Sequence, residues 1–442
     1  MSRKIAVFGT GYLGATHAAC MAELGHDVLG VDVDEAKLGK LAAGELPFYE
    51  PGLPEVLRRN IENGRLRFTP SYQEAADFAD VHFVAVGTPQ KHGELAADLR
   101  YVDAVIESLA PLLSRPSVIF GKSTVPAGTA ARLNGRVREL APVRDQAELA
   151  WNPEFLREGF AVKDTLHPDR IVLGVDSARP GNAEAVARDV YAPQLEQNIP
   201  FLVTDLATAE LVKTSANAFL ATKISFINAI AEVCEATGAD VSVLADAIGH
   251  DARIGRRFLN AGIGFGGGCL PKDIRAFIAM AGELGAGQAF ALLREVDSIN
   301  MRRRNKMVEL AREAAGGSFI GARIAVLGAA FKPDSDDVRD SPALNIAGQI
   351  QLQGAAVSVY DPEAMQNARQ LFPTLQYATD VCSACSGADV VMILTEWGQF
   401  TSLDPYELAK SVRQRTIIDG RNCLSPEGWR NAGWTYRGIG KP

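Results

Sequence analysis

The feature that most constrains the fold is a glycine-rich turn between an apolar run and a helical pattern near the start of the chain. KIAVFGTGYLG supplies Gly9, Gly11 and Gly14, and the next apolar run, DVLGVDV, ends at Asp32. Such glycines permit a tight turn, close approach of a pyrophosphate and close helix-sheet packing. A carboxylate after the second strand accepts hydrogen bonds from a ribose and repels a 2'-phosphate. The pattern predicts a Rossmann domain that binds NAD rather than NADP, with Lys37 near the adenosine end.

A second α/β pattern occupies the last part of the chain. The apolar runs ARIAVLGAAFK, AAVSVYDP, DVVMILTEW and TIIDGRN alternate with helical patterns. Their order echoes the first domain and places Asp361 where Asp32 stands, but the glycine fingerprint is missing, with Ala330 and Lys332 in the turn. The pattern predicts a Rossmann-like domain adapted to a ligand other than an ordinary dinucleotide.

A long helix is predicted between the two patterns, from about residue 205 to 238, where neither Gly nor Pro interrupts the sequence. Such a length suits a domain link or a subunit contact. We therefore predict an α/β fold of two Rossmann-like, doubly wound parallel-sheet domains joined by a long central helix. Residues 1–204 form the NAD-binding domain. Residues 205–316 form a linking and dimerisation domain that carries a catalytic cysteine, and residues 317–442 form the second Rossmann-like domain.

Composition excludes several classes of protein. The chain is 47% hydrophobic and 22% charged, as soluble domains are, and its net charge of -8 argues against a nucleic-acid surface. The short basic run of Arg302, Arg303, Arg304 and Lys306 is expected to be a solvated helix face. No charge-free apolar stretch reaches membrane-spanning length, and a strand occupies the place of a signal peptide. We expect a cytoplasmic protein with neither a membrane nor a nucleic acid as partner.

Cysteine and histidine spacings indicate neither a disulfide framework nor a metal site. Six cysteines over 442 residues are expected to stay reduced in a cytosolic chain. Cys382 and Cys385 form a lone C-x-x-C without a second pair at zinc spacing, so packing within a helix is the stronger interpretation. The six histidines also lack ligand spacing. We predict no metal.

The segment WNPEFLREG has the features of a helix start. Asn152 is a suitable cap, and Pro153 suits the first helical position. Glu154 and Glu158, four residues apart, would then share one face. Acidic residues in a first helical turn often only complement the helix dipole, so this pair by itself is weak evidence for a site.

The long helix carries a polar stripe in an otherwise apolar sequence. Lys213 and Asn217 are four residues apart, and Asn228 lies three turns further along the same stripe. The Lys-Asn pair therefore either faces water or lines a site, and periodicity favours neither.

The segment GFGGGCLPKD places Cys269 at a predicted helix N-terminus, because Pro271 begins the next helical pattern. This position favours a thiolate. The helix dipole contributes only about 0.3–1 kcal/mol, which is less than one pKa unit of about 1.4 kcal/mol. Asp273 opposes thiolate formation, and a nearby cation such as Lys213 would assist it. The glycines are expected to let a substrate or nicotinamide approach the backbone.

These segments, with VGTP, KSTVPAGT, AAFKPDSDDVRDSP and IIDGRN, resemble the UDP-glucose/GDP-mannose dehydrogenase family in order and over essentially the whole chain. Gly268 departs from the family, in which serine is common at that position. The resemblance implies oxidation of a sugar-nucleotide primary alcohol to a carboxylate by two NAD+. HPDRIVLG is more similar to the UDP-glucose members, whereas CLPKDIRA is similar to GDP-mannose members. UDP-glucose is favoured, and GDP-mannose or another nucleotide sugar stays open.

The resemblance also implies a division of chemical roles. A water held by Thr124 and Asp273 assists deprotonation of the alcohol. Lys213 and Asn217 stabilise developing oxyanions, where placed donors contribute most.

In the second half of the implied reaction, Cys269 attacks the aldehyde to form a thiohemiacetal, and loss of a second hydride leaves a thioester. Glu154 then assists hydrolysis. A nucleophile is needed because a hydride cannot usefully leave an aldehyde carbon until that carbon is tetrahedral.

Binding roles follow from the same resemblance, and Arg253 matches a position that reaches the neighbouring subunit's substrate, which implies at least a homodimer. An exposed arginine without that role is the alternative. The implied cofactor contacts are Gly9, Gly11, Tyr12, Leu13, Gly14, Asp32, Lys37, Thr88, Thr124, Glu158, Lys272 and Arg339. The implied substrate contacts are Glu154, Phe155, Leu156, Arg157, Glu158, Lys213, Asn217, Arg253, Asn260, Gly262, Phe265, Gly266, Lys332 and Arg421.

Two other functions compete with this interpretation. A two-electron dehydrogenase of the hydroxyacid type also joins a Rossmann domain to a helical one but needs no cysteine. It would form one NADH per substrate rather than two. A non-enzymatic sugar-nucleotide or NAD-binding regulator would bind NAD without turnover, and no feature of the sequence favours it.

Overall fold

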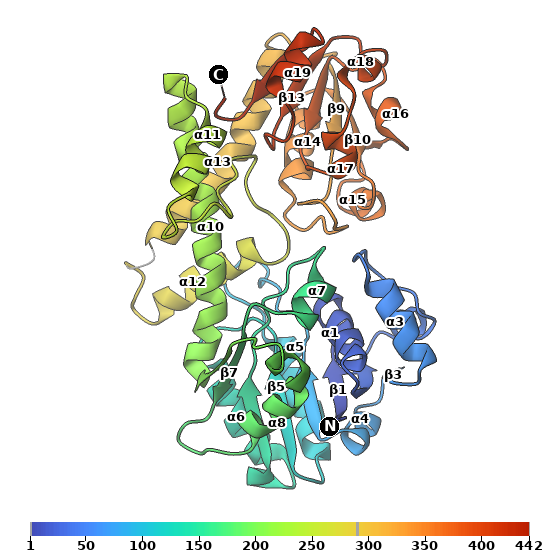
Figure 1. The fold of residues 1–442 in the computed structure, drawn as a ribbon, viewed down its shortest axis with the longest axis vertical. Helices are drawn as coiled ribbons and strands as arrows, with labels where there is room; N and C mark the ends of the chain where they lie inside the picture. Colours follow the sequence, from blue (N-terminus) through green and yellow to red (C-terminus); the bar gives the residue numbers. More distant parts are fainter. Residues whose placement is uncertain (1, 289–290, 442) are drawn as a thin grey trace. The chain divides into compact units, whose positions relative to one another are not determined.

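The computed structural model describes residues 2–288 and 291–441 (Figure 1). The chain divides into two compact units. The first comprises Met1–Ala216 with Arg275–Glu283, and the second comprises Asn217–Ile274 with Leu284–Pro442. Each unit is described by itself.

The first unit contains an eight-stranded sheet in the order β3-β2-β1-β4-β5-β6-β7-β8. Its first six positions, from β3 to β6, are parallel and follow the Rossmann order. The last two strands run the other way, because β7 pairs antiparallel with β6, and β8 pairs parallel with β7. The strands are β1 (Lys4–Phe8), β2 (Asp27–Val31), β3 (Leu66–Thr69), β4 (Val81–Val84), β5 (Ser117–Gly121), β6 (Ala147–Trp151), β7 (Ile171–Val175) and β8 (Phe201–Asp205).

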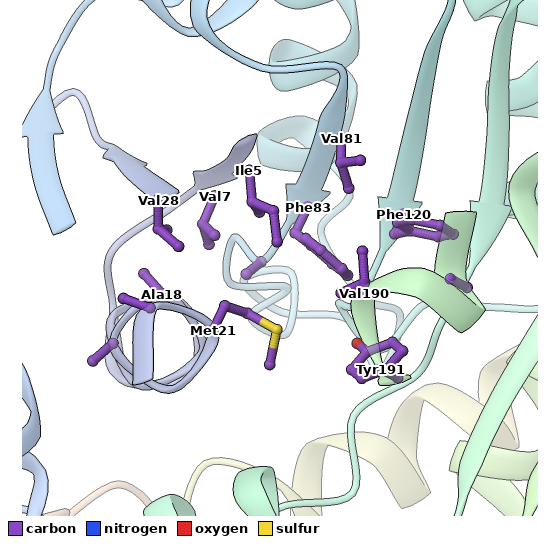
Figure 2. Close-up of a cluster of buried hydrophobic side chains, with 14 of the residues drawn as sticks. Ile5, Val7, Ala18, Met21, Val28, Val81, Phe83, Phe120, Val190 and Tyr191 are labelled. Carbon is purple, nitrogen blue, oxygen red and sulfur yellow. The ribbon is translucent and has the colours of Figure 1, made fainter. Parts of the chain in front are cut away.

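Helices cover both faces of this sheet, which explains its continuously apolar strands. Ile5 and Val7 of β1 belong to one buried cluster, whereas Ala6 and Phe8 belong to another. Figure 2 shows the first cluster, in which Met21 of α1 points toward the strands. The α-helices of this unit are α1 (Tyr12–Glu23), α2 (Glu35–Ala42), α3 (Leu53–Glu62), α4 (Tyr72–Phe78), α5 (Arg100–Leu109), α6 (Thr129–Leu140), α7 (Ala161–Leu166), α8 (Ala183–Val190) and α9 (Ala192–Leu195).

The second unit contains a six-stranded, all-parallel sheet in the order β11-β10-β9-β12-β13-β14. This is again the Rossmann order, so the predicted second Rossmann-like fold is confirmed. The strands are β9 (Arg323–Leu327), β10 (Ala356–Tyr360), β11 (Gln376–Tyr377), β12 (Val390–Ile393), β13 (Thr416–Asp419) and β14 (Thr435–Gly438). The accompanying helices are α14 (Pro342–Leu352), α15 (Met365–Leu371), α16 (Val381–Cys385), α17 (Gly398–Thr401), α18 (Pro405–Leu408) and α19 (Pro426–Asn431).

The predicted long helix is confirmed as α10 (Leu206–Thr237). It contributes to both units, as does α12 (Leu270–Glu283), while α11 (Val241–Gly249) and α13 (Ala291–Ala314) belong to the second. Within residues 2–288 and 291–441, no helix is both long and apolar enough to cross a bilayer.

The expectation of a solvated basic face on α13 is wrong for two of the four residues in the run Arg302, Arg303, Arg304 and Lys306. Arg303 and Arg304 are buried, and only Arg302 is exposed. The Arg303 guanidinium lies 3.5 Å from Glu232 and 3.4 Å from Glu235, and Arg304 lies 2.8 Å from the Asp340 carboxylate. These acidic partners come from distant parts of the chain, and they make burial of the two cations possible.

Candidate active site

The glycine turn of the first unit has room for a pyrophosphate at the N-terminus of α1. Gly9 has a φ of 88°, and an added Cβ would lie 2.7 Å from Val86. A Cβ at Gly14 would lie 1.7 Å from the Gly9 carbonyl oxygen, so these two glycines serve packing. By contrast, a Cβ at Gly11 would meet no atom within 4 Å, and α1 has no side-chain cap there. Open space before uncapped helical amides fits an anionic ligand.

Asp32 lies at the end of β2, where the ribose-binding carboxylate was predicted. Its Oδ2 accepts hydrogen bonds from Thr10 N (2.7 Å) and Thr10 Oγ1 (2.9 Å), and Lys37 Nζ lies 3.0 Å away. Its Oδ1 accepts one from Asp34 N at 3.1 Å. Burial raises the pKa of Asp32, but the bonds from Thr10 and Lys37 outweigh it and lower that pKa. The carboxylate is thus ionised, and Oδ1 keeps acceptor capacity for a ribose hydroxyl.

Of the other predicted cofactor residues of the first unit, Thr88 and Thr124 lie in loops, whereas Tyr12 and Leu13 lie in the first turn of α1. Thr88 donates a hydrogen bond to the Thr124 carbonyl oxygen at 2.8 Å, so these two threonines are in contact. Tyr12 donates to Glu50, a buried carboxylate. Leu13 packs against the hydrophobic core.

Glu50 also accepts hydrogen bonds from Gly159 N and Ala161 N, each at 2.7 Å. It therefore fastens the start of α7 to Tyr12 in the glycine turn. Burial, with Glu50 and the buried Glu158 nearby, raises the pKa of Tyr12 well above its usual value. Tyr12 is therefore a neutral hydrogen-bond donor in this turn.

The predicted helix at WNPEFLREG is wrong, since residues 152–157 are not helical and α7 begins only at Ala161. Asn152 cannot serve as a cap because its side chain is buried in other hydrogen bonds. Its Nδ2 donates to the Val172 carbonyl oxygen at 2.8 Å, and its Oδ1 accepts from the Tyr191 hydroxyl at 2.6 Å. Glu154 and Glu158 therefore do not share a helical face.

Glu154 instead holds the turn that follows it. Its Oε1 accepts hydrogen bonds from Phe155 N at 2.8 Å and Leu156 N at 3.0 Å. Its Oε2 lies 3.0 Å from the Nζ of Lys122, which directly follows β5. Burial alone would raise the pKa of Glu154, but the charge of Lys122 and these hydrogen bonds lower it.

Sequence reasoning missed Lys122. The available signal was a lysine directly after the apolar strand SVIFG, at the carboxyl edge of a parallel sheet, where ligands of such sheets bind.

Lys213 of α10 belongs to the first unit and lies near the Glu154 segment. Its Nζ is 5.6 Å from the centroid of the Phe155 ring, and Arg170 lies 3.7 Å from the same centroid. Arg157 pairs with Asp164 at 2.7 Å. The polar stripe on α10 thus contacts predicted substrate residues at this end.

The second unit places Cys269 immediately before α12, as predicted. Cys269 is exposed, and its carbonyl oxygen accepts a hydrogen bond from Asp273 N at 3.0 Å. Asp273 is buried, with its Oδ2 accepting from Asn217 Nδ2 at 2.6 Å and its Oδ1 2.5 Å from Lys272 Nζ. The first turn of α12 therefore joins Cys269, Lys272 and Asp273 to Asn217 of α10.

Protein neighbours, rather than a ligand, explain the bare backbone before Cys269, so the expected reason for these glycines needs correction. An added Cβ at Gly266 would lie 2.4 Å from the Asp340 carbonyl oxygen. Gly267, with a φ of 83°, would bring a Cβ within 2.8 Å of the Phe331 ring.

The two outer glycines of the segment are also crowded. A Cβ at Gly264, where φ is 95°, would lie 2.3 Å from the Asn300 side chain, and one at Gly268 would lie 2.2 Å from the Arg339 guanidinium. The family's common serine at position 268 would therefore require Arg339 to move. The guanidinium, which pairs with Asp337, is the far end of a flexible side chain, so this movement costs little free energy.

Hydrogen bonds join the loop before Cys269 to its surroundings in the second unit. Asn228 of α10 is fully buried, and its Oδ1 accepts from Gly262 N at 2.9 Å. Phe265 N donates to Asn300 Oδ1 at 2.7 Å. The Asn228 end of the polar stripe therefore faces inward and positions predicted substrate residues.

Arg421 ties this loop to the carboxyl edge of the second sheet. It donates to the carbonyl oxygens of Leu394 (2.9 Å), Gly264 (3.2 Å) and Phe331 (3.0 Å), and it lies 3.2 Å from Glu396. These segments follow β12, β9 and β13 at the edge where open α/β sheets bind ligands.

Three further predicted substrate residues of the second unit lie around this loop. Lys332 Nζ is 5.4 Å from the Phe331 ring centroid, and Asn260 accepts a hydrogen bond from Arg256 at 2.7 Å. The Arg253 side chain is 89% exposed and pairs with Asp251.

The six predicted catalytic residues divide equally between the units. The first unit holds Thr124, Glu154 and Lys213, and the second holds Asn217, Cys269 and Asp273.

Three family models match the chain in sequence order. The NAD binding domain of the UDP-glucose/GDP-mannose dehydrogenase family matches residues 3–195, the central domain matches 207–302, and the UDP binding domain matches 325–426. The glycine turn, Cys269 and Arg421 therefore fall in successive domains of one family.

Full-length relatives agree with these matches. The UDP-glucose 6-dehydrogenase of Rhizobium meliloti (strain 1021) is 42% identical over 99% of this chain and 100% of its own. A UDP-glucose dehydrogenase structure from Pyrobaculum islandicum is 38% identical, with a TM-score of 0.91 over 100% of this chain and 98% of that one. A UDP-D-ManNAc dehydrogenase from Pyrococcus horikoshii is 28% identical, with a TM-score of 0.86 over 99% of both chains. This chain therefore belongs to the UDP-glucose/GDP-mannose dehydrogenase family and carries its NAD binding domain.

Proposed function

We propose that the protein oxidises UDP-glucose to UDP-glucuronate in two two-electron steps through a covalent intermediate on Cys269. The observation that carries the proposal is an exposed cysteine at the start of α12, beside the buried Asn217–Asp273 pair, in a chain of this family. NAD supplies the hydride acceptor when bound. Gly11 and Asp32 support its binding by leaving space for a pyrophosphate and an acceptor for a ribose.

In the first step, Asp273 and Thr124 hold the water that takes the proton of the sugar's primary alcohol. The Asn217 amide fixes the Asp273 carboxylate by its 2.6 Å hydrogen bond. Lys213 and Asn217 donate to the oxygen on which charge develops.

In the second step, the Cys269 thiolate bonds to the aldehyde carbon, and hydride loss from that carbon leaves a thioester. The oxygen of a water then bonds to the acyl carbon, the C–S bond breaks, and sulfur leaves as a thiolate. Glu154 accepts the proton of that water. Because Lys122 lowers its pKa, Glu154 is ionised and able to accept at neutral pH.

The test is to count NADH while substrate and variants are changed. Two NADH per UDP-glucose support the thioester route, whereas one supports a hydroxyacid-type oxidation and contradicts the proposal. Cys269→Ala should abolish carboxylate formation without preventing NAD binding. Unimpaired conversion by this variant would remove Cys269 from its role.

A second substrate has specific support. The relative from Pyrococcus horikoshii acts, by its name, on a UDP-linked N-acetylmannosamine and shares this fold over nearly the whole chain. NADH formation with a UDP-N-acetylhexosamine or GDP-mannose, and none with UDP-glucose, would replace the proposed substrate while keeping the chemistry.

We also propose that the protein is cytoplasmic and forms a homodimer in which the α10 helices of two copies pack against each other. Phe219, Phe226 and Val233 are 66%, 51% and 58% exposed. Their spacing of seven residues places them on one helix face, as in helices that pack against each other. Phe226→Asp should convert a dimer or larger assembly to monomers in sedimentation velocity, and an unchanged assembly would contradict this contact.

A further inference from the structure

Lys122 is a buried cation to which the proposed reaction gives no direct task. Its side chain is 4% exposed. Its Nζ donates to Asn152 Oδ1 at 3.0 Å and to the Tyr191 hydroxyl at 3.4 Å, and it lies 3.0 Å from Glu154 Oε2. Lysine is almost never fully buried unless it is paired, so this arrangement requires a reason.

The neighbours of Lys122 hold the ammonium in one place. Asn152 is fixed by its bond to the Val172 carbonyl oxygen, and Tyr191 donates to the same Asn152 oxygen that Lys122 contacts. Since Asn152 and Tyr191 are neutral, Glu154 supplies the compensating charge.

Glu154 is left with one open acceptor position. A carboxylate offers about four lone-pair sites. Oε1 accepts from Phe155 N and Leu156 N, whereas within residues 2–288 and 291–441 Oε2 has Lys122 as its polar partner. Glu154 has a 15% exposed side chain, so water can reach it.

We propose that Lys122 is a positioning residue that holds Glu154 as a fixed anion, whose remaining Oε2 acceptor site orients the water that hydrolyses the Cys269 thioester. This inference rests on the role proposed above for Glu154. A carboxylate stabilised in this way is a weaker base, but it stays deprotonated over the whole working pH range.

The other titratable groups around the pair do not take over the task of Lys122. Burial lowers the pKa of His17, with Lys122 contributing, so this histidine of α1 stays neutral. Burial raises the pKa of the Cys20 thiol and of Tyr191, and Glu154 adds to both shifts. Lys122 is therefore the cation that contacts Glu154 directly, and its charge is the largest of the contributions that lower the pKa of that carboxyl.

The decisive variant is Lys122→Met, which removes the charge and keeps most of the volume. A buried carboxyl without its cation has a raised pKa, so the acid limb of thioester hydrolysis should move up by about two pH units or more. At about pH 5 the rate should therefore fall by about 10-fold or more, whereas near pH 9 it should approach the wild-type rate. The measurement is single-turnover hydrolysis of the acyl-enzyme, followed by rapid quench and intact mass at each pH.

Three further variants separate the explanations. Lys163→Met, at an exposed lysine of α7, is the matched control and should leave rate and acid limb unchanged. Glu154→Gln should slow hydrolysis by about 100-fold at every pH. Adding Lys122→Met to Glu154→Gln should cost no further rate, because Lys122 acts through Glu154.

Each other outcome overturns a defined statement. If Lys122→Met hydrolyses the thioester more slowly than wild type by the same factor at every pH, or at the wild-type rate, Lys122 is not a positioning residue. If Glu154→Gln hydrolyses the thioester at full rate, the proposed role of Glu154 fails first. Should Lys122→Met not fold, the wild-type enzyme still decides the matter. Its hydrolysis rate should show no acid limb down to about pH 5.5, and a limb between pH 6 and 7 would refute the proposal.

Discussion

The two Rossmann-like sheets of this protein begin with the same turn and use it differently. Gly9 N donates to the Val31 carbonyl oxygen at 2.8 Å, and Gly328 N donates to that of Tyr360 at the same distance. Both glycines have positive φ, 88° and 112°. The first glycine of the fingerprint is thus retained in the second domain, although the full fingerprint is missing, because the turn itself requires it.

The carboxylates that follow the second strand of each sheet have opposite roles. Asp361 is fully buried, and its Oδ2 accepts from Ala329 N (2.7 Å), Ala330 N (3.0 Å) and Trp397 Nε1 (3.1 Å). Its Oδ1 accepts two further backbone hydrogen bonds. Asp32, by comparison, keeps acceptor capacity on Oδ1.

The first helices also differ. In the first sheet α1 starts at Tyr12, directly after the turn, whereas α14 starts only at Pro342, with Ser341 as its cap. Residues 329–341 separate the second turn from α14, so no helical amides follow that turn directly. The comparison teaches that one topology binds a dinucleotide only where the turn carboxylate and the helix N-terminus are both left available.

The largest expected effect tests the structural role of Asp361. Asp361→Ala leaves five donors without their acceptor, four of them buried, and each unsatisfied buried group costs about 1–3 kcal/mol. We expect a loss of at least about 4 kcal/mol in the free energy of unfolding, measured by denaturant titration. NAD affinity of the folded fraction should not change, and a reduced affinity would show that this turn also serves NAD.

The matched substitution in the first sheet should have the opposite signature. Asp32→Ala should weaken NAD binding by about 10- to 100-fold, the value of a hydrogen bond to a charged group, and should lower the free energy of unfolding by less than Asp361→Ala does. Calorimetric titration with NAD measures the affinity, and denaturant titration measures the free energy of unfolding. Equal stability losses in both aspartate variants would remove the distinction between the two sheets.

A pH dependence sharpens the comparison further. Because the pKa of Asp32 is lowered in the folded protein, its ionised form adds stability above its unfolded pKa of about 4. That contribution is lost as pH falls through the lower, folded pKa. Wild type should therefore lose more stability between pH 5 and 3 than Asp32→Asn, by about 1 kcal/mol. Parallel stability profiles would contradict the hydrogen bonding described for Asp32.

The smallest expected effect concerns Gly11. A Cβ there would enter the open space before α1, so Gly11→Ala should weaken NAD binding by about fivefold, or about 1 kcal/mol. Its extended backbone suits alanine, and stability should stay unchanged. Gly14→Ala is the informative contrast, because its Cβ would collide with the backbone at 1.7 Å and destabilise the fold. Unchanged NAD affinity in Gly11→Ala would place the pyrophosphate elsewhere.

Sequence reasoning located several continuously apolar strands, but it missed β7, which is also apolar, together with strands that are less so. The runs at β1 and β2 are buried on both faces, so local composition predicts them. By contrast, β6 contains Glu148, whose carboxylate accepts hydrogen bonds from Asn182 N and Ala183 N. Strand β8 lies at the sheet edge and is partly exposed, so it lacks a buried run.

The wrong predictions for Asn152, Arg303 and Arg304 also arise because their partners lie far away in the sequence. Asn152 has the residue type of a helix cap, but Val172 and Tyr191 satisfy its side chain. Arginine is usually exposed, but Arg303 and Arg304 are buried beside acidic residues that lie far away in the sequence. Neither set of partners can be identified from local spacing.

The sequence by itself determined the α/β class, both Rossmann-like sheets, the long helix and the position of Cys269 before α12. These depend on apolar periodicity and on Gly and Pro, which act within a few residues. Only the tertiary structure decided that Lys122 pairs with Glu154, that Asp361 is consumed by its own turn, and that the glycines before Cys269 make room for Phe331 and Asp340. Such contacts join residues that are far apart in the sequence and meet only after the helices have packed on the sheets. A buried polar group must form a hydrogen bond or ion pair with the partner that this packing brings to it.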